Sequence, residues 1–198
     1  MTCPVRPSVV PYIAAWSTEE QVSPDPVRAD RLRFPGEPDG LAQGEPLWLR
    51  RALRQGHGRP LYGRVHPQRQ RRAMRALLCQ VCGGPADRDE RGWLWLLPDG
   101  RADWAGWPDG LMTVFPPVCG PCAPVALREC PQLAAGCVAV RVGRSEVCGV
   151  YGARYWPDPQ VPPTVGVVED DDPGVRWVLA TQLLRSLSWC TVVELPVA

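Results

Sequence analysis

The apolar residues of this chain fall into short runs that alternate with polar turns. Proline and glycine, 24 and 19 of the 198 residues, separate these runs and favour short elements over long helices. Runs of this length that are rich in valine, leucine and tryptophan predict β-strands. The predicted strands are Val9–Trp16, Trp93–Leu97, Val138–Val142, Val147–Tyr151, Thr164–Val168 and Thr191–Leu195.

A helical pattern begins at Pro67, a residue type that is well tolerated in the first turn of a helix, and extends to Leu78. Apolar side chains fall on one face of this predicted helix and arginines on the opposite face. The apolar residues are Met74, Leu77 and Leu78, and the arginines are Arg69, Arg72 and Arg75. We therefore expect the apolar face to pack against the core and the arginines to be exposed.

Two more helices are predicted, one over 123–130 and one that begins with Asp172 as its N-cap and Pro173 as its first residue. The second is indicated by apolar residues at helical spacing, namely Trp177, Ala180, Leu184 and Leu187. The acidic run at 169–172 fits capping of this helix, because carboxylates interact favourably with a helix N-terminus. Binding of a hard cation by the same carboxylates is the alternative.

These elements predict an α+β fold with short strands and a C-terminal strand–helix–strand segment. The expected divisions are an N-terminal strand with a Pro/Arg-rich region over 1–66, a zinc module over 67–137 and a C-terminal α/β segment over 138–198, which together could form one compact domain. The Pro-rich segment from Ser23 to Pro46 is predicted to be a loop. Pro98-Asp99-Gly100-Arg101 predicts a turn after the strand at 93–97, and therefore a hairpin.

Two Cys-x-x-Cys pairs give the most specific chemical signal in the chain. The first is Cys79 with Cys82, and the second is Cys119 with Cys122. Four thiolates delivered as two such pairs suit one structural Zn²⁺ in tetrahedral coordination, with no position left open for catalysis. The alternatives are coincidence or a redox dithiol, although a redox motif needs only one pair.

The other cysteines have no partner at ligand spacing. Cys130 could replace one of the zinc ligands, but a small buried side chain is the simpler interpretation of it. The remaining thiols are predicted to be core or incidental residues, and they are Cys3, Cys137, Cys148 and Cys190.

The charge distribution is uneven. All 22 basic residues are arginine, and nine of them lie between Pro46 and Ala86, where there is no Asp or Glu. Because the whole chain carries +1, subtracting these nine leaves −8 for the rest. A basic segment of this kind indicates a phosphate-bearing partner, DNA or RNA, with a solvated arginine face or pairing with the acidic remainder as the alternatives. The candidate nucleic-acid-binding residues are Arg64, Arg69, Arg71, Arg72 and Arg75.

The order of a cysteine knuckle, a hairpin and a helix carrying the second cysteine pair resembles a treble-clef zinc site over roughly Leu78–Leu133. Arg71–Gly83 together with Val118–Cys122 resembles the zinc-bound frame of HNH-type endonucleases. That family places a catalytic His and an Asn or second His between and after the cysteine pairs. This chain has no Asn, and its only histidines, His57 and His66, precede the first pair. The resemblance implies the frame without the nuclease activity.

The whole chain also resembles an actinobacterial zinc-binding protein family that shares the Arg-rich Gly-x-Val-His-Pro stretch before the knuckle, and this resemblance implies no activity. We expect a non-catalytic protein that binds nucleic acid. A protein-interaction or scaffold module is the alternative, and an enzyme that uses His57 or His66 is the second alternative. Four tryptophans lie between the cysteine pairs, namely Trp93, Trp95, Trp104 and Trp107. They are predicted to be core residues, with stacking on bases as the alternative. Trp104 and Trp107 are the better candidates for exposure.

No segment of the sequence approaches membrane-spanning length, and the short apolar run near the N-terminus is too weak for a signal peptide. We therefore expect no membrane partner and a cytoplasmic location, where reduced thiols are available for a metal.

Overall fold

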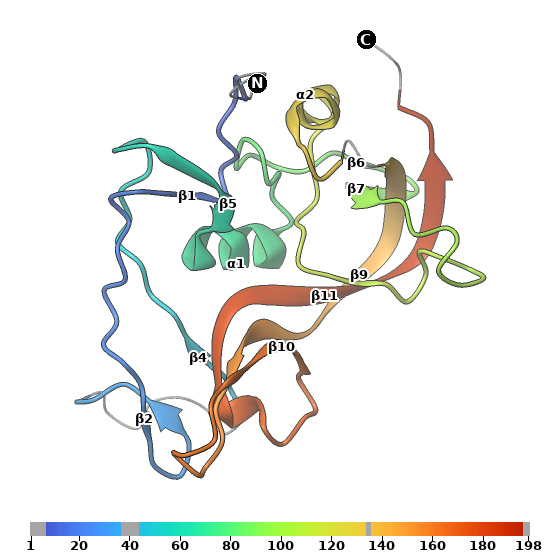
Figure 1. Ribbon diagram of the computed structural model, residues 1–198. Helices are drawn as coiled ribbons and strands as arrows, with labels where there is room; N and C mark the ends of the chain where they lie inside the picture. Colours follow the sequence, from blue (N-terminus) through green and yellow to red (C-terminus); the bar gives the residue numbers. More distant parts are fainter. Residues whose placement is uncertain (1–6, 37–43, 134–135, 196–198) are drawn as a thin grey trace, which may run out of the picture.

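Two long antiparallel strands form the centre of the protein in this computed structural model, which describes residues 7–36, 44–133 and 136–195. They are β9 (Cys137–Arg154) and β11 (Val178–Val193), and they pair from Val178↔Arg154 to Val193↔Ala139. Two register shifts, between Ala180 and Gln182 and between Leu184 and Arg185, interrupt the ladder. Such bulges bend a strand and increase its twist, and the β9–β11 ribbon follows a strong curve (Figure 1).

Five short strands extend this ribbon on both sides. The sheet has the order β4-β11-β9-β7-β6, while β10 also pairs with β9 and β8 also pairs with β11. All pairings are antiparallel except that of β4 with β11. The short strands are β4 (Leu47–Trp48), β6 (Arg88–Asp89), β7 (Gly92–Pro98), β8 (Met112–Thr113) and β10 (Thr164–Glu169). The sheet therefore takes strands from each of the three ranges expected from the sequence, and the division into those ranges stays a prediction.

The predicted C-terminal helix is wrong. Only a single 3₁₀ turn, η1 (Val175–Trp177), follows Asp172, and the chain then continues as β11. The first part of β11 is buried on both faces, so its apolar residues do not alternate with polar ones, and such a run fits a helical spacing equally well. The C-terminal segment is thus a group of antiparallel strands, and the two strands predicted at 138–142 and 147–151 are parts of the single strand β9.

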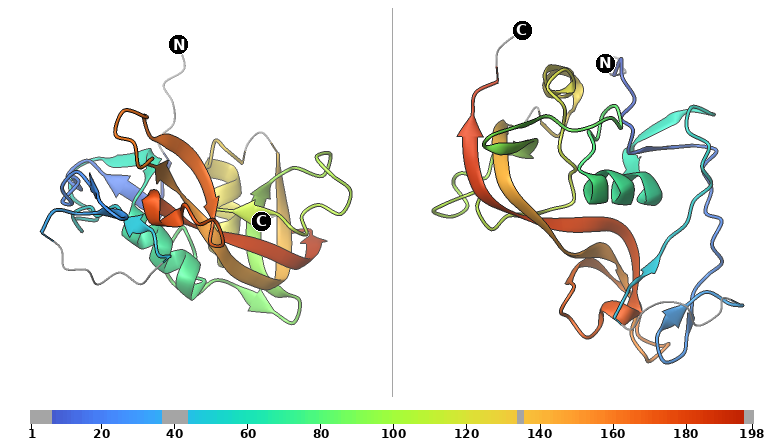
Figure 2. Two further views of the ribbon diagram at one scale, coloured as in Figure 1. Left: turned by 90° about the horizontal axis from the view of Figure 1, so that it is seen from below. Right: turned by 180° about the vertical axis from the view of Figure 1, so that it is seen from behind.

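The predicted helix after Pro67 is confirmed as α1 (Pro67–Ala76). It lies inside the curve of the ribbon (Figures 1 and 2) and packs on β11. Met74 is fully buried among Val150, Val178 and Leu183. The Gln70 side chain accepts a hydrogen bond from the Leu183 amide at 2.8 Å and donates one to the Leu183 carbonyl at 2.9 Å. These contacts fix the position of α1 on the sheet.

The second predicted helix is confirmed as α2 (Cys122–Glu129), one residue earlier than expected. The hairpin lies before the strand at 93–97 and not after it, because β7 turns back from β6 through Asp89↔Gly92 and Arg88↔Trp93. Pro98 is followed by a loop that reaches Met112. In the part of the chain that the structure describes, no helix is long and apolar enough to cross a membrane.

The N-terminal part, which precedes α1 and is described from residue 7, lies against α1 and the first cysteine pair. Only the end of the predicted strand at 9–16 is a strand, β1 (Ala14–Trp16), and it pairs with β5 (Pro60–Val65), which sequence reasoning missed. The predicted loop at 23–46 contains a short antiparallel pair, and its residues 37–43 lie outside the described residues. The members of this pair are β2 (Val27–Arg28) and β3 (Leu32–Arg33).

A buried ion pair connects the N-terminal part to α1. The Arg69 guanidinium donates to both carboxylate oxygens of Glu19, at 2.5 and 2.7 Å, and to the Ala14 carbonyl at 2.6 Å. Burial by itself raises the pKa of Glu19, but the bonds from Arg69 and from the Trp16 amide, with the nearby His66, outweigh it and lower that pKa. The carboxylate is therefore held in its charged form.

Replacing Glu19 with Gln should destabilise the protein by about 3–5 kcal/mol at neutral pH, because it leaves the buried Arg69 charge without its partner. The exposed neighbour is the control, and Glu20→Gln should change the free energy of unfolding by less than about 0.5 kcal/mol. Denaturant unfolding measures both values. Equal effects of the two variants would contradict the role given to this ion pair.

The same pair predicts an acid-dependent stability. Because the pKa of Glu19 is lowered by folding, its contribution is complete above the ordinary value of 4.5 and is lost as the pH falls through the lower folded value. Unfolding measured from pH 6 to pH 3 should therefore show a steeper loss of stability in the wild type than in the Glu19→Gln variant. Parallel curves would contradict this assignment.

Candidate metal centre

The first cysteine pair lies in a tight turn immediately after α1. Leu77 has the left-handed conformation (φ 50°) that ends the helix, and Gly83 is also left-handed at φ 75°. The Cys79 amide donates to the Gly84 carbonyl at 2.7 Å, and the Gly83 amide donates to the Cys79 carbonyl at 2.8 Å. These bonds close the turn and direct both thiols to the same side.

The second cysteine pair is positioned by the start of α2. Cys122 is the first residue of the helix, and the amides of Cys122 and Ala123 both donate to the Cys119 carbonyl at 3.1 Å. This geometry brings the thiol of Cys119, which precedes the helix, next to the thiol of Cys122 in its first turn.

Backbone hydrogen bonds hold the two turns against each other. The Gln80 amide donates to the Pro117 carbonyl at 2.9 Å, and the Val118 amide donates to the Leu94 carbonyl of β7 at 2.9 Å. The Asp87 amide in turn donates to the Val118 carbonyl at 3.0 Å. The relative position of the cysteine pairs is therefore set by the backbone as well as by the thiols.

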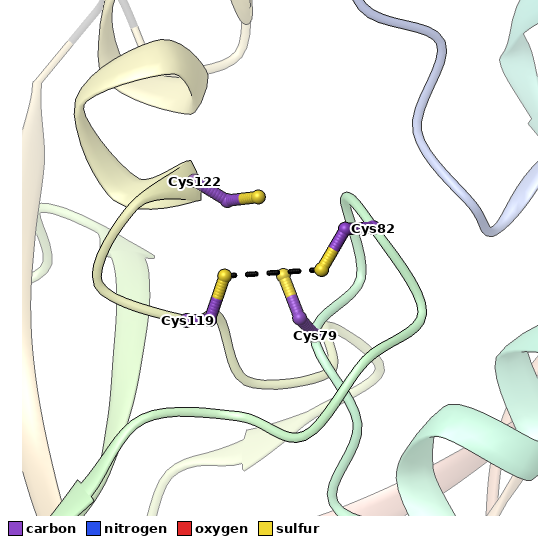
Figure 3. Close-up of side chains that lie close together, drawn as sticks. All are labelled: Cys79, Cys82, Cys119 and Cys122. Atoms are coloured by element: carbon purple, nitrogen blue, oxygen red, sulfur yellow. Dashed lines mark hydrogen bonds between the residues drawn. The ribbon is translucent and has the colours of Figure 1, made fainter.

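The four thiols come together at one point, as predicted from their spacing. The Sγ atoms of Cys79, Cys82, Cys119 and Cys122 all lie within 4.8 Å of one another, and Cys82 Sγ is 3.8 Å from Cys119 Sγ (Figure 3). Cys79 is buried, Cys82 is exposed, and the other two are half-buried. This compact donor set could hold one metal ion in a four-thiolate site.

The electrostatics of the cluster favour a cation at its centre. Burial raises the pKa of the Cys79 thiol, and burial together with the neighbouring thiols raises that of Cys122. Burial also acts to raise the pKa of Cys82, but the Gly84 amide and the surrounding thiols lower it. Several thiolates at this spacing repel one another, so a divalent cation would supply the charge that allows all of them to ionise.

The described cysteines outside this cluster have other surroundings. Cys130 is half-buried, and the four-cysteine group of the described residues does not include it. Burial raises the pKa of Cys137 to about 11 and that of Cys190 to about 12, and both half-buried thiols pack against hydrophobic clusters. Cys3 lies outside the described residues.

The predicted arginines are divided between the surface and the interior. Arg64, Arg72 and Arg75 are exposed, and Arg71 is half-buried with its guanidinium 4.1 Å from the ring centre of Trp48. The prediction that Arg69 is exposed is wrong, because Arg69 is only 4 % exposed and forms an ion pair with Glu19. The helical spacing correctly placed Arg69 on α1, but the N-terminal segment that covers it is distant in the sequence.

Sequence reasoning missed two aromatic rings beside the arginines of α1. The Tyr12 hydroxyl lies 3.5 Å from Nη1 of Arg72, and the Trp48 ring lies under Arg71. Tyr12 is brought there by the bond from its amide to the Val81 carbonyl at 2.8 Å. Trp48 is brought there by the pairing of β4 with β11. No local pattern marks either residue, since each depends on a long-range contact.

The histidines occupy different environments. His57 is exposed, whereas His66 is fully buried, with Nε2 3.2 Å from the Ala52 carbonyl and 3.8 Å from a Glu19 oxygen. Burial lowers the pKa of His66. These surroundings fit a core residue, and in the described part of the chain the His66 ring lies beside a backbone carbonyl and a carboxylate.

The tryptophans differ in burial, and the prediction that the acidic run caps a helix is wrong because no α-helix follows it. Trp95 is fully buried, and Trp104 is 41 % exposed, as predicted. Trp107 is packed in the core, contrary to the prediction of exposure. Asp172 accepts a hydrogen bond from the Gly174 amide and forms an ion pair with Arg154, so this carboxylate stabilises the turn that precedes η1.

Comparisons of this chain with protein-family models, with curated proteins and with solved structures find no match. The resemblance to the HNH frame and to the actinobacterial family therefore stays a prediction.

Loss of one cysteine ligand should remove the metal and destabilise the region around α2, because the free energy of metal binding at such a site is part of the folding free energy. We expect Cys119→Ser to lose the metal in elemental analysis and to lower the melting temperature. A chelator should have the same effect on the wild type. The control is Cys148→Ser, which replaces a half-buried thiol outside the cluster and should leave the metal bound. Equal metal content in both variants would contradict this site.

Proposed function

We propose that the protein is a non-catalytic zinc protein that binds nucleic acid through the exposed arginines of α1. Zinc is supported by the donor spacing. Tetrahedral Zn²⁺ with thiolate bonds of about 2.3 Å places its sulfurs about 3.8 Å apart. The sulfurs of Cys82 and Cys119 lie 3.8 Å apart, and all four lie within 4.8 Å. Four thiolates leave no open coordination position, so the ion is structural.

A treble-clef frame is supported by the order of the elements. The turn at Cys79–Cys82 is followed by the β6–β7 hairpin and then by α2, which carries Cys122 in its first turn. The bond from the Val118 amide to the Leu94 carbonyl joins the second cysteine pair to this hairpin.

Elemental analysis of the purified protein should give one zinc per chain.

The observation that carries the nucleic-acid proposal is the state of the arginines on α1. Arg72 and Arg75 are exposed and lie one turn apart on the helix that leads into the first cysteine pair. Among the described residues, no carboxylate forms a salt bridge with either of them or with the exposed Arg64 of β5. Side chains in this state are free to bind phosphate groups.

The helix presents these arginines from a fixed position. Its opposite side is held by the Gln70 bonds to β11, by the burial of Met74 and by the ion pair of Arg69 with Glu19. The bond from Arg185 to the Met74 carbonyl at 2.8 Å holds the end of the helix. Because the backbone of the helix is already ordered, binding has to restrict only the arginine side chains, which favours affinity for a charged polymer.

The double variant Arg72→Gln/Arg75→Gln should weaken binding to many DNA and RNA sequences alike. Each phosphate contact that is lost should reduce the log–log slope of affinity against salt by about 0.7–0.9, so we expect a reduction of about 1.4–1.8. Fluorescence anisotropy at several salt concentrations measures this slope, and the melting temperature should change little because both residues are exposed.

A charge-matched control is Arg101→Gln/Arg128→Gln, which removes two exposed arginines from the loop after β7 and from α2. It should keep the slope of the wild type. A wild type that binds neither DNA nor RNA at low salt would overturn the proposed function.

A second candidate function, association with another protein chain, is favoured by the outer edge of β10. In the described residues this strand pairs with β9 alone, and its Val165 and Val167 are 66 % and 49 % exposed. There is no charged residue from Pro159 to Val168, although charges are a common protection of edge strands. We infer a second copy of this chain as the occupant, because antiparallel pairing about Gly166 places Val165 of one copy opposite Val167 of the other.

If β10 forms such an edge contact, Val165→Lys should convert a dimer to a monomer, because it places a charge opposite the apolar Val167 of the other copy and brings the two introduced charges to diagonal positions on the same face. Sedimentation at micromolar to millimolar protein concentration measures the mass. Val22→Lys, at a valine that is 61 % exposed in the N-terminal part, is the control and should leave the mass unchanged. A monomeric wild type at the highest concentration would exclude this association.

A further inference from the structure

A small hollow lies between β4 and α1, beside the basic face of the helix. It has a volume of about 250 Å³. The lining residues are Leu47, Trp48, Leu49, Arg50, Gln68 and Arg71. None of them is acidic, and Arg71 is followed one turn later by the exposed Arg75. The hollow is therefore an apolar and cationic extension of the surface that carries Arg72 and Arg75.

One wall of the hollow is a stack of a guanidinium on an indole ring. The guanidinium carbon of Arg71 lies 4.1 Å from the ring centre of Trp48. Trp48 is itself packed against the core cluster that contains Met74 and Val178, so the ring cannot turn away. A planar guanidinium held in this way has its other face available for a second planar group.

Arg71 carries a charge that is partly removed from solvent. Its Nε is buried and has no hydrogen-bond partner among the described residues, as is also the case for the Nε atoms of Arg69 and Arg141. Burial, with the nearby charge of Arg75 as a smaller cause, lowers the pKa of Arg71, and the charge of Glu45 acts weakly in the opposite direction. A negative charge beside the guanidinium of Arg71 would offset the cost of its partial burial.

The size and chemistry of the hollow restrict the ligand. Its volume is below the range of about 300–1,000 Å³ that is usual for sites of complete small-molecule ligands. It suits one planar unit of a larger molecule whose remaining parts lie outside. An aromatic ring with acceptor atoms, joined to phosphates that reach neighbouring arginines, matches these features.

We propose that this hollow binds one unstacked base of single-stranded nucleic acid, with the base on the outer face of the Arg71 guanidinium and the adjoining phosphates on Arg72 and Arg75. The proposal rests on the proposed function and narrows it, because a base within a duplex is stacked on its neighbours and is not free to enter the hollow. The protein therefore prefers single strands to duplexes of the same sequence.

The test compares binding of one single-stranded oligonucleotide, its duplex and a single strand with abasic positions, by fluorescence anisotropy at one salt concentration. Arg71→Lys keeps the charge and leaves an aliphatic stem over Trp48, but it removes the planar stacking surface. We expect this variant to weaken single-strand binding about 5- to 100-fold, in line with the contribution of one stacked base, and to leave the salt slope unchanged. Arg72→Lys keeps a phosphate contact and should change affinity by less than about 3-fold.

The abasic strand makes the test independent of any effect of the variant on folding. The wild type should bind it about 5- to 100-fold more weakly than the complete strand, whereas Arg71→Lys should bind both strands alike. Binding of the wild type that is equal for single strand, duplex and abasic strand would overturn the base site and leave the proposed function intact. Absence of binding to all of them would overturn the proposed function and the base site together.

Discussion

The antiparallel pairing of β9 with β11 is the interaction on which the other parts of the fold depend. Every other strand of the main sheet is attached to one of these two directly or through β7. The bulges in their ladder bend the ribbon, and the bend creates the concave side in which α1 lies. Because α1 is fixed there by Gln70 and Met74, the cysteine turn that follows the helix is also brought to a defined position.

The candidate metal centre joins two parts of the chain that backbone hydrogen bonds and a shared hydrophobic cluster also hold together. Cys79 and Cys82 follow α1, and Cys119 and Cys122 lead into α2. Between them, β7 is built into the sheet beside β9, and the loop after β7 returns the chain to the second cysteine pair. A metal ion at this point would link the turn after α1 to the start of α2 and add to the apolar contacts already present there.

The two sides of helix α1 have different roles, one structural and the other in the proposed binding. One side packs against the rest of the protein. On this side Arg69 forms an ion pair with Glu19, and the Gln70 side chain forms hydrogen bonds with β11. The other side presents Arg72 and Arg75 to solvent, with the Trp48–Arg71 stack at its border. The same residue type therefore serves as a buried ion-pair partner, a stacking surface and a solvent-exposed charge, according to what the rest of the chain places beside it.

The sequence by itself determined the features that depend on neighbours a few residues apart. The spacing of the two cysteine pairs predicted the thiol cluster, and the periodicity after Pro67 predicted α1, because both patterns are set by local geometry. The predicted strands at 93–97 and 164–168 are present for the same reason. The hydrophobic pattern also indicated a mixed α+β protein, which the structure has.

Only the tertiary structure decided which partner each of these elements meets. The segment after Asp172 became β11 and not a helix, because β9 and β4 lie on its two edges and a strand buried on both faces has no alternating pattern. Arg69 is buried because Glu19, fifty positions earlier, is folded over it. The hollow beside Arg71 exists because β4 brings Trp48 to α1. Such contacts join residues far apart in the chain, and local periodicity contains no information about them.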